Sequence, residues 1–246
     1  MPYKKVSEYS CKKLYYKYVN KNFNGISINS NSDIFTEFEK LIGNKFVAKV
    51  DVGEKRRGNN GLIVLNKTKD DIINWIKEIK QKGYNKFLIE EYHQIKNEFY
   101  ISFRSDLDGD WILYFKQGGV NIGNADDKVK KFLIDPNKLD FQIISDDFGV
   151  NVNQVLSNLY SIYQKYHFNL MEVNPLVLTE NNMIIPLDFA ASLDETANFL
   201  FSQENINYSE NDHIRNITDQ EKTINDLDSK TGASLKFNLI NPNGRV

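Results

Sequence analysis

Hydrophobic positions recur at two different spacings along this chain, and their order predicts alternating helices and strands. Apolar residues three and four positions apart predict helices over residues 6–19, 34–42, 68–81 and 154–166. Short apolar runs between polar turns predict strands over residues 25–28, 46–50, 61–65, 87–92, 98–104, 111–117, 170–178, 183–189 and 234–240. The pattern predicts an α+β protein with two mixed lobes and a cleft between them.

Turn and cap residues divide these elements. Ser7, the pair Ser32-Asp33 and Thr68 precede apolar-periodic stretches and are expected to cap helices. The stretch 198–219 is polar and aperiodic, and we expect it to be a linker or a long loop.

Composition and charge narrow the class of protein. The 246 residues are 41% hydrophobic and 26% charged, and the net charge of −2 argues against a nucleic-acid-binding protein. A single cysteine, Cys11, excludes an intrachain disulfide and a multi-cysteine zinc site. No apolar run approaches the roughly 18 residues of a membrane span, and residues 1–13 lack a signal-peptide core. We therefore expect a cytoplasmic protein without membrane or nucleic-acid partners.

A lysine and a basic loop form the first candidate site. Lys49 lies near the end of an apolar strand, so its ammonium group either reaches solvent or points into a cleft. The sequence Lys-Arg-Arg-Gly-Asn-Asn-Gly follows at 55–61. Such a loop either wraps phosphates with cations and backbone N–H groups or is a solvated basic hairpin. The chain contains neither a Walker A motif nor G-x-G-x-x-G.

Carboxylates at strand ends are further candidates. Glu90 and Glu91 end one predicted strand and Glu98 opens the next, where each either binds ribose or adenine or is a surface charge. Glu172 and Asn174 share one face of an apolar strand, with Asp188 on the strand expected to pair with it. This trio either holds magnesium beside nucleotide phosphates or closes the hairpin as a hydrogen-bonded polar cluster.

Taken together, these segments resemble the ATP-grasp portion of the ATP-citrate lyase family, which is related to the succinyl-CoA synthetase β subunit. The resemblance covers nearly the whole chain in order. It is carried by Lys-Arg-Arg-Gly-x-x-Gly-Leu at 55–62, Phe-Leu-Ile-Glu at 87–90, Gly-Gly-Val-x-x-Gly at 118–123, Glu-Val-Asn-Pro-Leu-Val at 172–177, Leu-Asp-Phe-Ala-Ala at 187–191 and Asp-Leu-Asp-Ser-Lys-Thr-Gly-Ala-Ser-Leu at 226–235. The strand at 172–177 is shared across the superfamily, whereas the loop at 55–62 and the stretch at 226–235 point to the citrate enzymes.

The resemblance implies a site for ATP and Mg²⁺. Lys49, Arg57 and the backbone of Gly58 would hold phosphates, and Asn174 and Asp188 would carry Mg²⁺ beside those phosphates.

The same resemblance assigns the rest of the nucleotide site. The hinge Glu90 to His93 would meet adenine through backbone groups of Glu91 and His93, and Glu98 would bind ribose. Glu172 would be the catalytic residue that meets the histidine receiving phosphate.

A second magnesium-associated loop is implied near the end of the chain. Asp228, Thr231 and the carbonyl of Ala233 would form it by resemblance; from the residues alone, the stretch is either a metal or phosphate loop or a turn before a strand. The resemblance also implies an ATP-grasp domain over 1–240, with a small lobe at about 21–92 and a large lobe from 1–20 and 93–240. Residues 241–246 would begin a citrate-binding domain of the CoA-ligase type.

The implied function is part of an enzyme that uses ATP, citrate and coenzyme A to make acetyl-CoA and oxaloacetate. ATP would phosphorylate a histidine on a partner subunit or domain, and the reaction would continue through citryl phosphate and citryl-CoA to a lyase domain. His93, His167 and His213 do not lie in glycine-rich turns like that of the family's acceptor histidine. We therefore expect no full reaction from this chain alone. The alternatives are a citryl-CoA or succinyl-CoA synthetase β-type fragment and a non-catalytic nucleotide-binding module.

Overall fold

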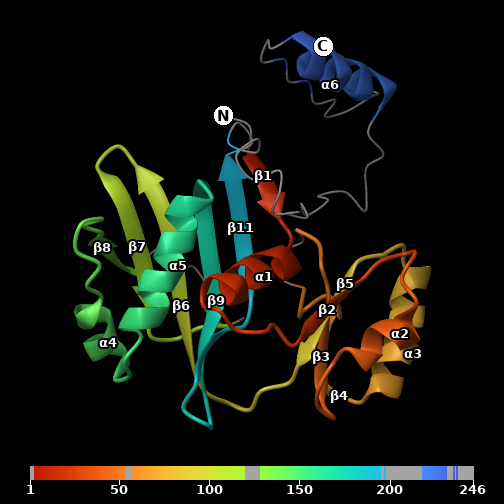
Figure 1. The fold of residues 1–246 in the computed structure, drawn as a ribbon, viewed down its shortest axis with the longest axis horizontal. Helices are drawn as coiled ribbons and strands as arrows, with labels where there is room; N and C mark the ends of the chain where they lie inside the picture. Colours follow the sequence, from red (N-terminus) through yellow and green to blue (C-terminus); the bar gives the residue numbers. More distant parts are fainter. Residues whose placement is uncertain are drawn as a thin grey trace. The chain divides into compact units, whose positions relative to one another are not determined.

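The computed structural model describes residues 3–53, 57–119, 128–194, 197, 218–231, 235 and 237. The chain forms two compact units, Met1–Asn211 and Asp212–Val246, which we describe separately. The first unit contains two β-sheets (Figure 1). A hydrophobic core packs on each sheet. The expectation of a mixed α+β fold is confirmed.

The smaller sheet has four antiparallel strands in the order β2-β5-β3-β4. Its strands are β2 (Gly25–Ile28), β3 (Phe46–Val50), β4 (Ile63–Lys67) and β5 (Phe87–Glu91), and its helices are α2 (Ile34–Glu39) and α3 (Lys69–Gln81). Thr68 and Asp71 form a capping box at the start of α3, which fixes where that helix begins. The apolar face of α3 then packs on the sheet through Ile72, Ile76 and Ile79.

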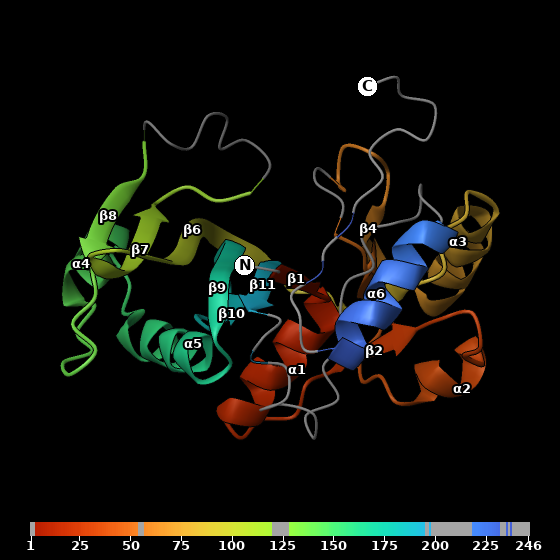
Figure 2. The same cartoon turned by 90° about the horizontal axis from the view of Figure 1, so that it is seen from above.

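The larger sheet has seven strands in the order β1-β11-β9-β6-β7-β8, with β10 paired to β9. Its strands are β1 (Tyr3–Val6), β6 (Ile95–Asp106), β7 (Gly109–Phe115), β8 (Lys130–Leu133), β9 (Phe168–Thr179), β10 (Ile184–Pro186) and β11 (Phe189–Asp194). Helices α1 (Glu8–Tyr18) and α5 (Asn153–Lys165) contribute to its core and lie on the same side of the sheet (Figure 2). The short helix α4 (Gln142–Phe148) also contributes, through buried Ile144.

Most predicted elements are confirmed, and the departures have local causes. The strand predicted over 183–189 is wrong in one respect: pairing stops at Pro186 and resumes at Phe189, so Asp188 lies between β10 and β11. Strands β1 and β8 and helix α4 were not predicted from the sequence.

In the second unit the structure describes helix α6 (Asp219–Thr231), where the sequence analysis expected a linker and a turn. The strand expected over 234–240 falls almost wholly outside the described residues. Within the described part of the chain, none of the helices has the length and apolar character needed to cross a bilayer.

Candidate functional site

Six charged side chains from distant parts of the sequence meet where α1 approaches the smaller sheet, and we call them the ion cluster. Its members are Glu8 and Lys12 on α1, Lys49 on β3, Arg57 after β3, Glu90 on β5 and Asp188 between β10 and β11. Three carboxylates therefore face three cations. Buried charges are tolerated when they are paired in this way.

Lys49 is buried, and its ammonium group lies close to three oxygen acceptors. Its Nζ donates to Glu8 Oε1 at 2.6 Å and to the carbonyl oxygen of Leu187 at 2.5 Å, and lies 3.1 Å from Glu90 Oε1. The strand β3 places it there, because Lys49 lies opposite Leu88 of β5 and Ile63 of β4 in a segment with no exposed residue. Of the two orientations that the sequence left open, the structure shows the one directed inward.

Arg57 joins three segments. Its Nη1 donates to the carbonyl of Val50 at 2.9 Å, and its Nη2 donates to Glu8 Oε2 and Asp188 Oδ1, both at 2.6 Å. Gly58 follows in a turn in which Leu62 N donates to the carbonyl of Arg57. Lys55 and Arg56 of the same basic loop lie outside the described residues.

Glu8 and Lys12 were missed by the sequence analysis. They are an i, i+4 pair whose charged ends lie 2.8 Å apart, and both are almost completely buried. The sequence carries a signal for them, because positions 8, 11, 12 and 15 share one helix face with buried Cys11 and Tyr15. A charged pair on the apolar face of a helix is the pattern to look for.

The ion cluster favours the charged forms of Glu8 and Lys49 and disfavours the charged form of Asp188. Burial on its own raises the pKa of the Glu8 carboxyl, but Lys12, Lys49 and Arg57 outweigh burial and hold the pKa well below its ordinary value. Burial lowers the pKa of Lys49, but Glu8, Glu90 and Asp188 outweigh it and raise the pKa, so the ammonium stays charged. For Asp188, burial and the neighbouring Glu8 raise the pKa to about 6 against the opposing effect of Arg57 and Lys49.

The three oxygen-bearing residues of the predicted metal site lie on or beside β9. Asn174 N donates to the carbonyl of Asp188 at 3.0 Å, and Asn174 Oδ1 accepts from Gly119 N at 2.7 Å. Glu172, two residues earlier on the same strand, accepts a hydrogen bond from the Tyr100 hydroxyl at 3.3 Å. A carboxylate and an amide oxygen are hard donors that suit Mg²⁺ when phosphates complete its coordination.

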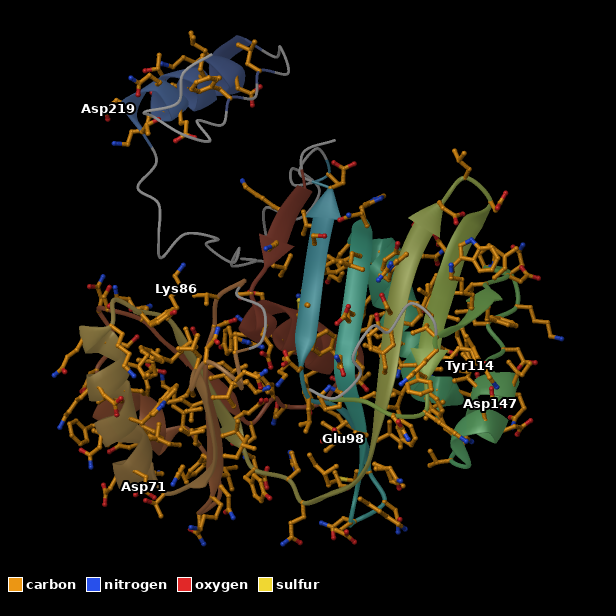
Figure 3. The ribbon with its side chains drawn as sticks, turned by 180° about the vertical axis from the view of Figure 1, so that it is seen from behind. Asp71, Lys86, Glu98, Tyr114, Asp147 and Asp219 are labelled. Atoms are coloured by element: carbon orange, nitrogen blue, oxygen red, sulfur yellow. The ribbon has the colours of Figure 1, made fainter. Side chains whose placement is uncertain are left out.

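The predicted hinge residues have separate environments. The Glu90 side chain is committed to Lys12, whose Nζ lies 2.5 and 2.6 Å from its two oxygens. Glu91 Oε2 accepts from Asn24 Nδ2 at 3.0 Å, and His93 is partly exposed. Glu98 lies near the start of β6 (Figure 3). Its backbone carbonyl accepts from Gly118 N at 2.9 Å, and its carboxylate lies next to Gly119.

The residues of the second predicted magnesium loop belong to the other unit. Asp228 lies on α6, where its Oδ1 accepts from Leu235 N at 2.7 Å, and Thr231 ends the helix. Ala233 lies outside the described residues. Over the described ranges, no group of three or more His, Cys, Asp and Glu residues is arranged to hold a metal ion by itself.

Two protein-family models match this chain. The model described as the ATP-citrate synthase ATP-grasp domain matches residues 2–205, and the model described as ATP citrate lyase citrate-binding matches residues 215–246.

Similar proteins were also found among curated sequences and solved structures. The ATP-citrate synthase of Mus musculus is 32% identical over 277 residues, which cover 100% of this chain and 25% of that protein. A probable ATP-citrate synthase subunit 2 of Schizosaccharomyces pombe is 32% identical over 270 residues, covering 87% of this chain and 55% of that subunit. The fold is similar to that of ATP citrate lyase from Methanothrix soehngenii, solved in complex with citrate and coenzyme A, with a TM-score of 0.75, 24% identity and coverage of 99% of this chain and 64% of that one. The chain spans about a quarter of the length of the animal relatives that it matches.

Proposed function

We propose that this chain, which belongs to the ATP-citrate synthase family, binds Mg-ATP through its ATP-grasp domain. It would then transfer the terminal phosphoryl group of ATP to a histidine outside the chain. The whole enzyme would use ATP, citrate and coenzyme A to make acetyl-CoA and oxaloacetate. Citrate and coenzyme A would bind largely outside these residues, and the phosphohistidine and the lyase domain would belong to a partner subunit or domain.

The observation that carries this proposal is the ion cluster. Lys49 and Arg57 are separated by eight positions and are nevertheless held by one carboxylate, Glu8, with Asp188 alongside. Two cations beside Asp188, whose backbone carbonyl accepts from Asn174 N, match the needs of a phosphate chain and its metal ion. A solvated basic hairpin would not require a buried arginine and a buried lysine.

The cations would act on the phosphoryl group as it moves. Lys49 and Arg57 would bind oxygens of the ATP phosphates and stabilise the negative charge on the transferred group. Mg²⁺, held by Asn174 and Asp188, would supply further positive charge to those oxygens. Glu172 would orient the incoming histidine, because it lies on the same strand and face as Asn174.

The remaining assignments rest on family membership. The backbones of Gly58, Glu91 and His93, with the side chain of Glu98, would bind the nucleotide, and Asp228, Thr231 and Ala233 would form a second magnesium-associated segment. The ATP-grasp domain would cover residues 1–240, and residues 241–246 would begin the citrate-binding domain, whose family model matches from residue 215 onward. We keep the expectation of a cytoplasmic location, which the single cysteine supports.

The test is phosphoryl transfer. The chain is combined with the remaining portion of the enzyme, ATP labelled on the terminal phosphate is added with Mg²⁺, and acid-labile label on protein histidine is followed. We expect label to appear with the combination and no citrate cleavage by the 246-residue chain alone. ATP binding without transfer would favour a non-catalytic nucleotide-binding module, and transfer followed by use of succinate would favour a succinyl-CoA synthetase-type reaction.

A further inference from the structure

We propose that Glu8 is the positioning residue that fixes Lys49 and Arg57 for phosphoryl transfer. This inference rests on the proposed function, in which those two cations bind the ATP phosphates. Glu8 itself would contact neither the nucleotide nor the histidine. Its effect would pass through Lys49 and Arg57, which are two of the three cations that it contacts.

The contacts of Glu8 divide between its two carboxylate oxygens. Oε1 accepts from Lys49 Nζ at 2.6 Å, and Oε2 accepts from Arg57 Nη2 at 2.6 Å. Glu8 therefore contacts both cations, whereas Glu90 contacts Lys49 and Asp188 contacts Arg57. Because one carboxylate contacts both cations, it fixes the distance between the Lys49 ammonium and the Arg57 guanidinium.

The burial of these carboxylates shows which contact a phosphate would replace. The side chain of Glu8 is 1% exposed, and that of Asp188 is 27% exposed. A ligand that arrives from solvent would meet Arg57 on the Asp188 side. Glu8 would then remain bound to Lys49 and Arg57 from behind while the phosphates occupy the front.

The backbone of Glu8 is also fixed to the strand that carries Lys49. Asp51, two residues after Lys49, accepts from Glu8 N at 2.8 Å and from Tyr9 N at 3.2 Å. The start of α1 is further capped by Ser7, whose hydroxyl accepts from Ser10 N. These contacts tie α1 to β3, so the Glu8 carboxylate is placed by the fold rather than by a flexible side chain.

The charge count predicts a separation of binding from chemistry. Glu8→Gln keeps the size of the side chain and leaves three cations facing two carboxylates. The surplus positive charge favours the negatively charged phosphates, so ATP affinity should be unchanged or tighter. Transfer should be slowed by about 10²-fold, because a misplacement of about 1 Å in a catalytic group has an effect of this size.

The experiment compares wild type, Glu8→Gln and a control, Glu37→Gln, in which the ion pair between Glu37 on α2 and Lys40, the residue after that helix, is lost. Calorimetry measures Mg-ATP affinity, and labelled ATP measures histidine phosphorylation in the chain combined with the rest of the enzyme. We expect the wild type and the control to agree in both, and Glu8→Gln to lose transfer alone. Equal losses of affinity and transfer, or no loss in either, would overturn the positioning role.

A second variant separates the positioning role of Glu8 from its contribution to the charge balance and the folding of the protein. Glu8→Gln combined with Lys12→Met leaves two cations facing two carboxylates, so the charge balance of the ion cluster returns. If Glu8 only neutralises charge, this double variant regains transfer and the inference is wrong. If Glu8 positions Lys49 and Arg57, the double variant folds, binds Mg-ATP and stays slow. A wild type that binds no Mg-ATP would instead refute the proposed function, which keeps the two failures apart.

Discussion

Arg57 Nη2 lies 2.6 Å from Asp188 Oδ1, so the side chain expected to bind phosphate and the side chain expected to bind magnesium are paired with each other. This pair has to open if each residue is to take its proposed ligand. Phosphate would replace Asp188 on Arg57, and Mg²⁺ would replace Arg57 on Asp188. Nucleotide and metal should therefore bind together more readily than either does alone.

Asp188→Asn should remove the dependence of ATP binding on magnesium. In the wild type, Mg²⁺ should strengthen ATP binding by at least about tenfold, the value of one charge-assisted contact. In the variant, ATP should bind about equally with and without Mg²⁺, because Arg57 has lost its ion pair with residue 188 and the metal has lost its carboxylate. Calorimetric titration of ATP in magnesium and in chelator measures both.

Asp108→Asn, in the exposed turn between β6 and β7, provides the matched control for this experiment. It should keep the magnesium dependence of the wild type. A magnesium dependence in Asp188→Asn as large as that of the wild type would show that Asp188 does not carry the metal.

Lys49→Met should weaken ATP binding. The loss of one charge-assisted contact predicts a fall of roughly ten- to a hundredfold in affinity. The variant should also unfold at a lower denaturant concentration, because Glu8 and Glu90 lose a shared cation inside the protein. Calorimetry and urea unfolding measure the two effects, with Lys40→Met at the exposed residue that follows α2 as the control. Normal ATP affinity in a folded Lys49→Met protein would remove Lys49 from the site.

Glu172→Gln should separate binding from transfer at the other end of the site. ATP affinity should stay close to normal, and phosphorylation of the histidine should slow by about 10²–10³-fold, by analogy with the removal of one transition-state contact. Tyr100→Phe removes the hydrogen bond to Glu172 and keeps the carboxylate, so it serves as the comparison. Parallel losses of affinity and rate in Glu172→Gln would make Glu172 a structural or metal-site residue instead.

Tyr114 donates a hydrogen bond to Asp147, and both residues lie outside the ion cluster (Figure 3). This contact allows us to predict how the stability of the fold depends on pH. Hydrogen bonds from Lys130 and Tyr114 lower the pKa of the Asp147 carboxyl. A lowered pKa contributes stability above the ordinary value of about 3.9, and that contribution is lost as the pH falls through the folded value. Asp147→Asn should therefore be less stable than the wild type at pH 7, with the difference shrinking at pH 3. Urea unfolding at both values checks this, and a constant difference would contradict it.

Local sequence patterns predicted the elements whose first and last residues are set by local interactions. The bounds of β2 and β3 match their predicted runs, because turn residues flank each apolar stretch. Strand β1 was missed because two of its four residues are lysines and its partner, β11, is distant in the sequence, with Tyr3 opposite Asp194. Helix α6 was missed because only Ile224 and Leu227 mark an apolar face. The capping box formed by Thr218 and Glu221 is the local signal that marks its start.

The candidate site shows the same limit. Lys49, Arg57 and Asp188 were singled out because charged residues interrupt apolar or glycine-containing stretches, and the structure brings these three together. Glu8 was not singled out, because an acidic residue in the first turn of a helix is common for electrostatic reasons alone. Its place on a helix face with Cys11 and Tyr15 is a local signal, but its partners Lys49 and Arg57 lie 41 and 49 positions away, beyond the reach of a local pattern.

The most direct measurement is a crystal structure of the chain with Mg²⁺ and a non-hydrolysable ATP analogue. We predict that phosphate oxygens lie within hydrogen-bonding distance of Lys49 and Arg57, that Asp188 has left Arg57 for the metal ion, and that Glu8 still holds both cations. An analogue bound elsewhere on the chain, with the Arg57–Asp188 pair intact, would contradict the account.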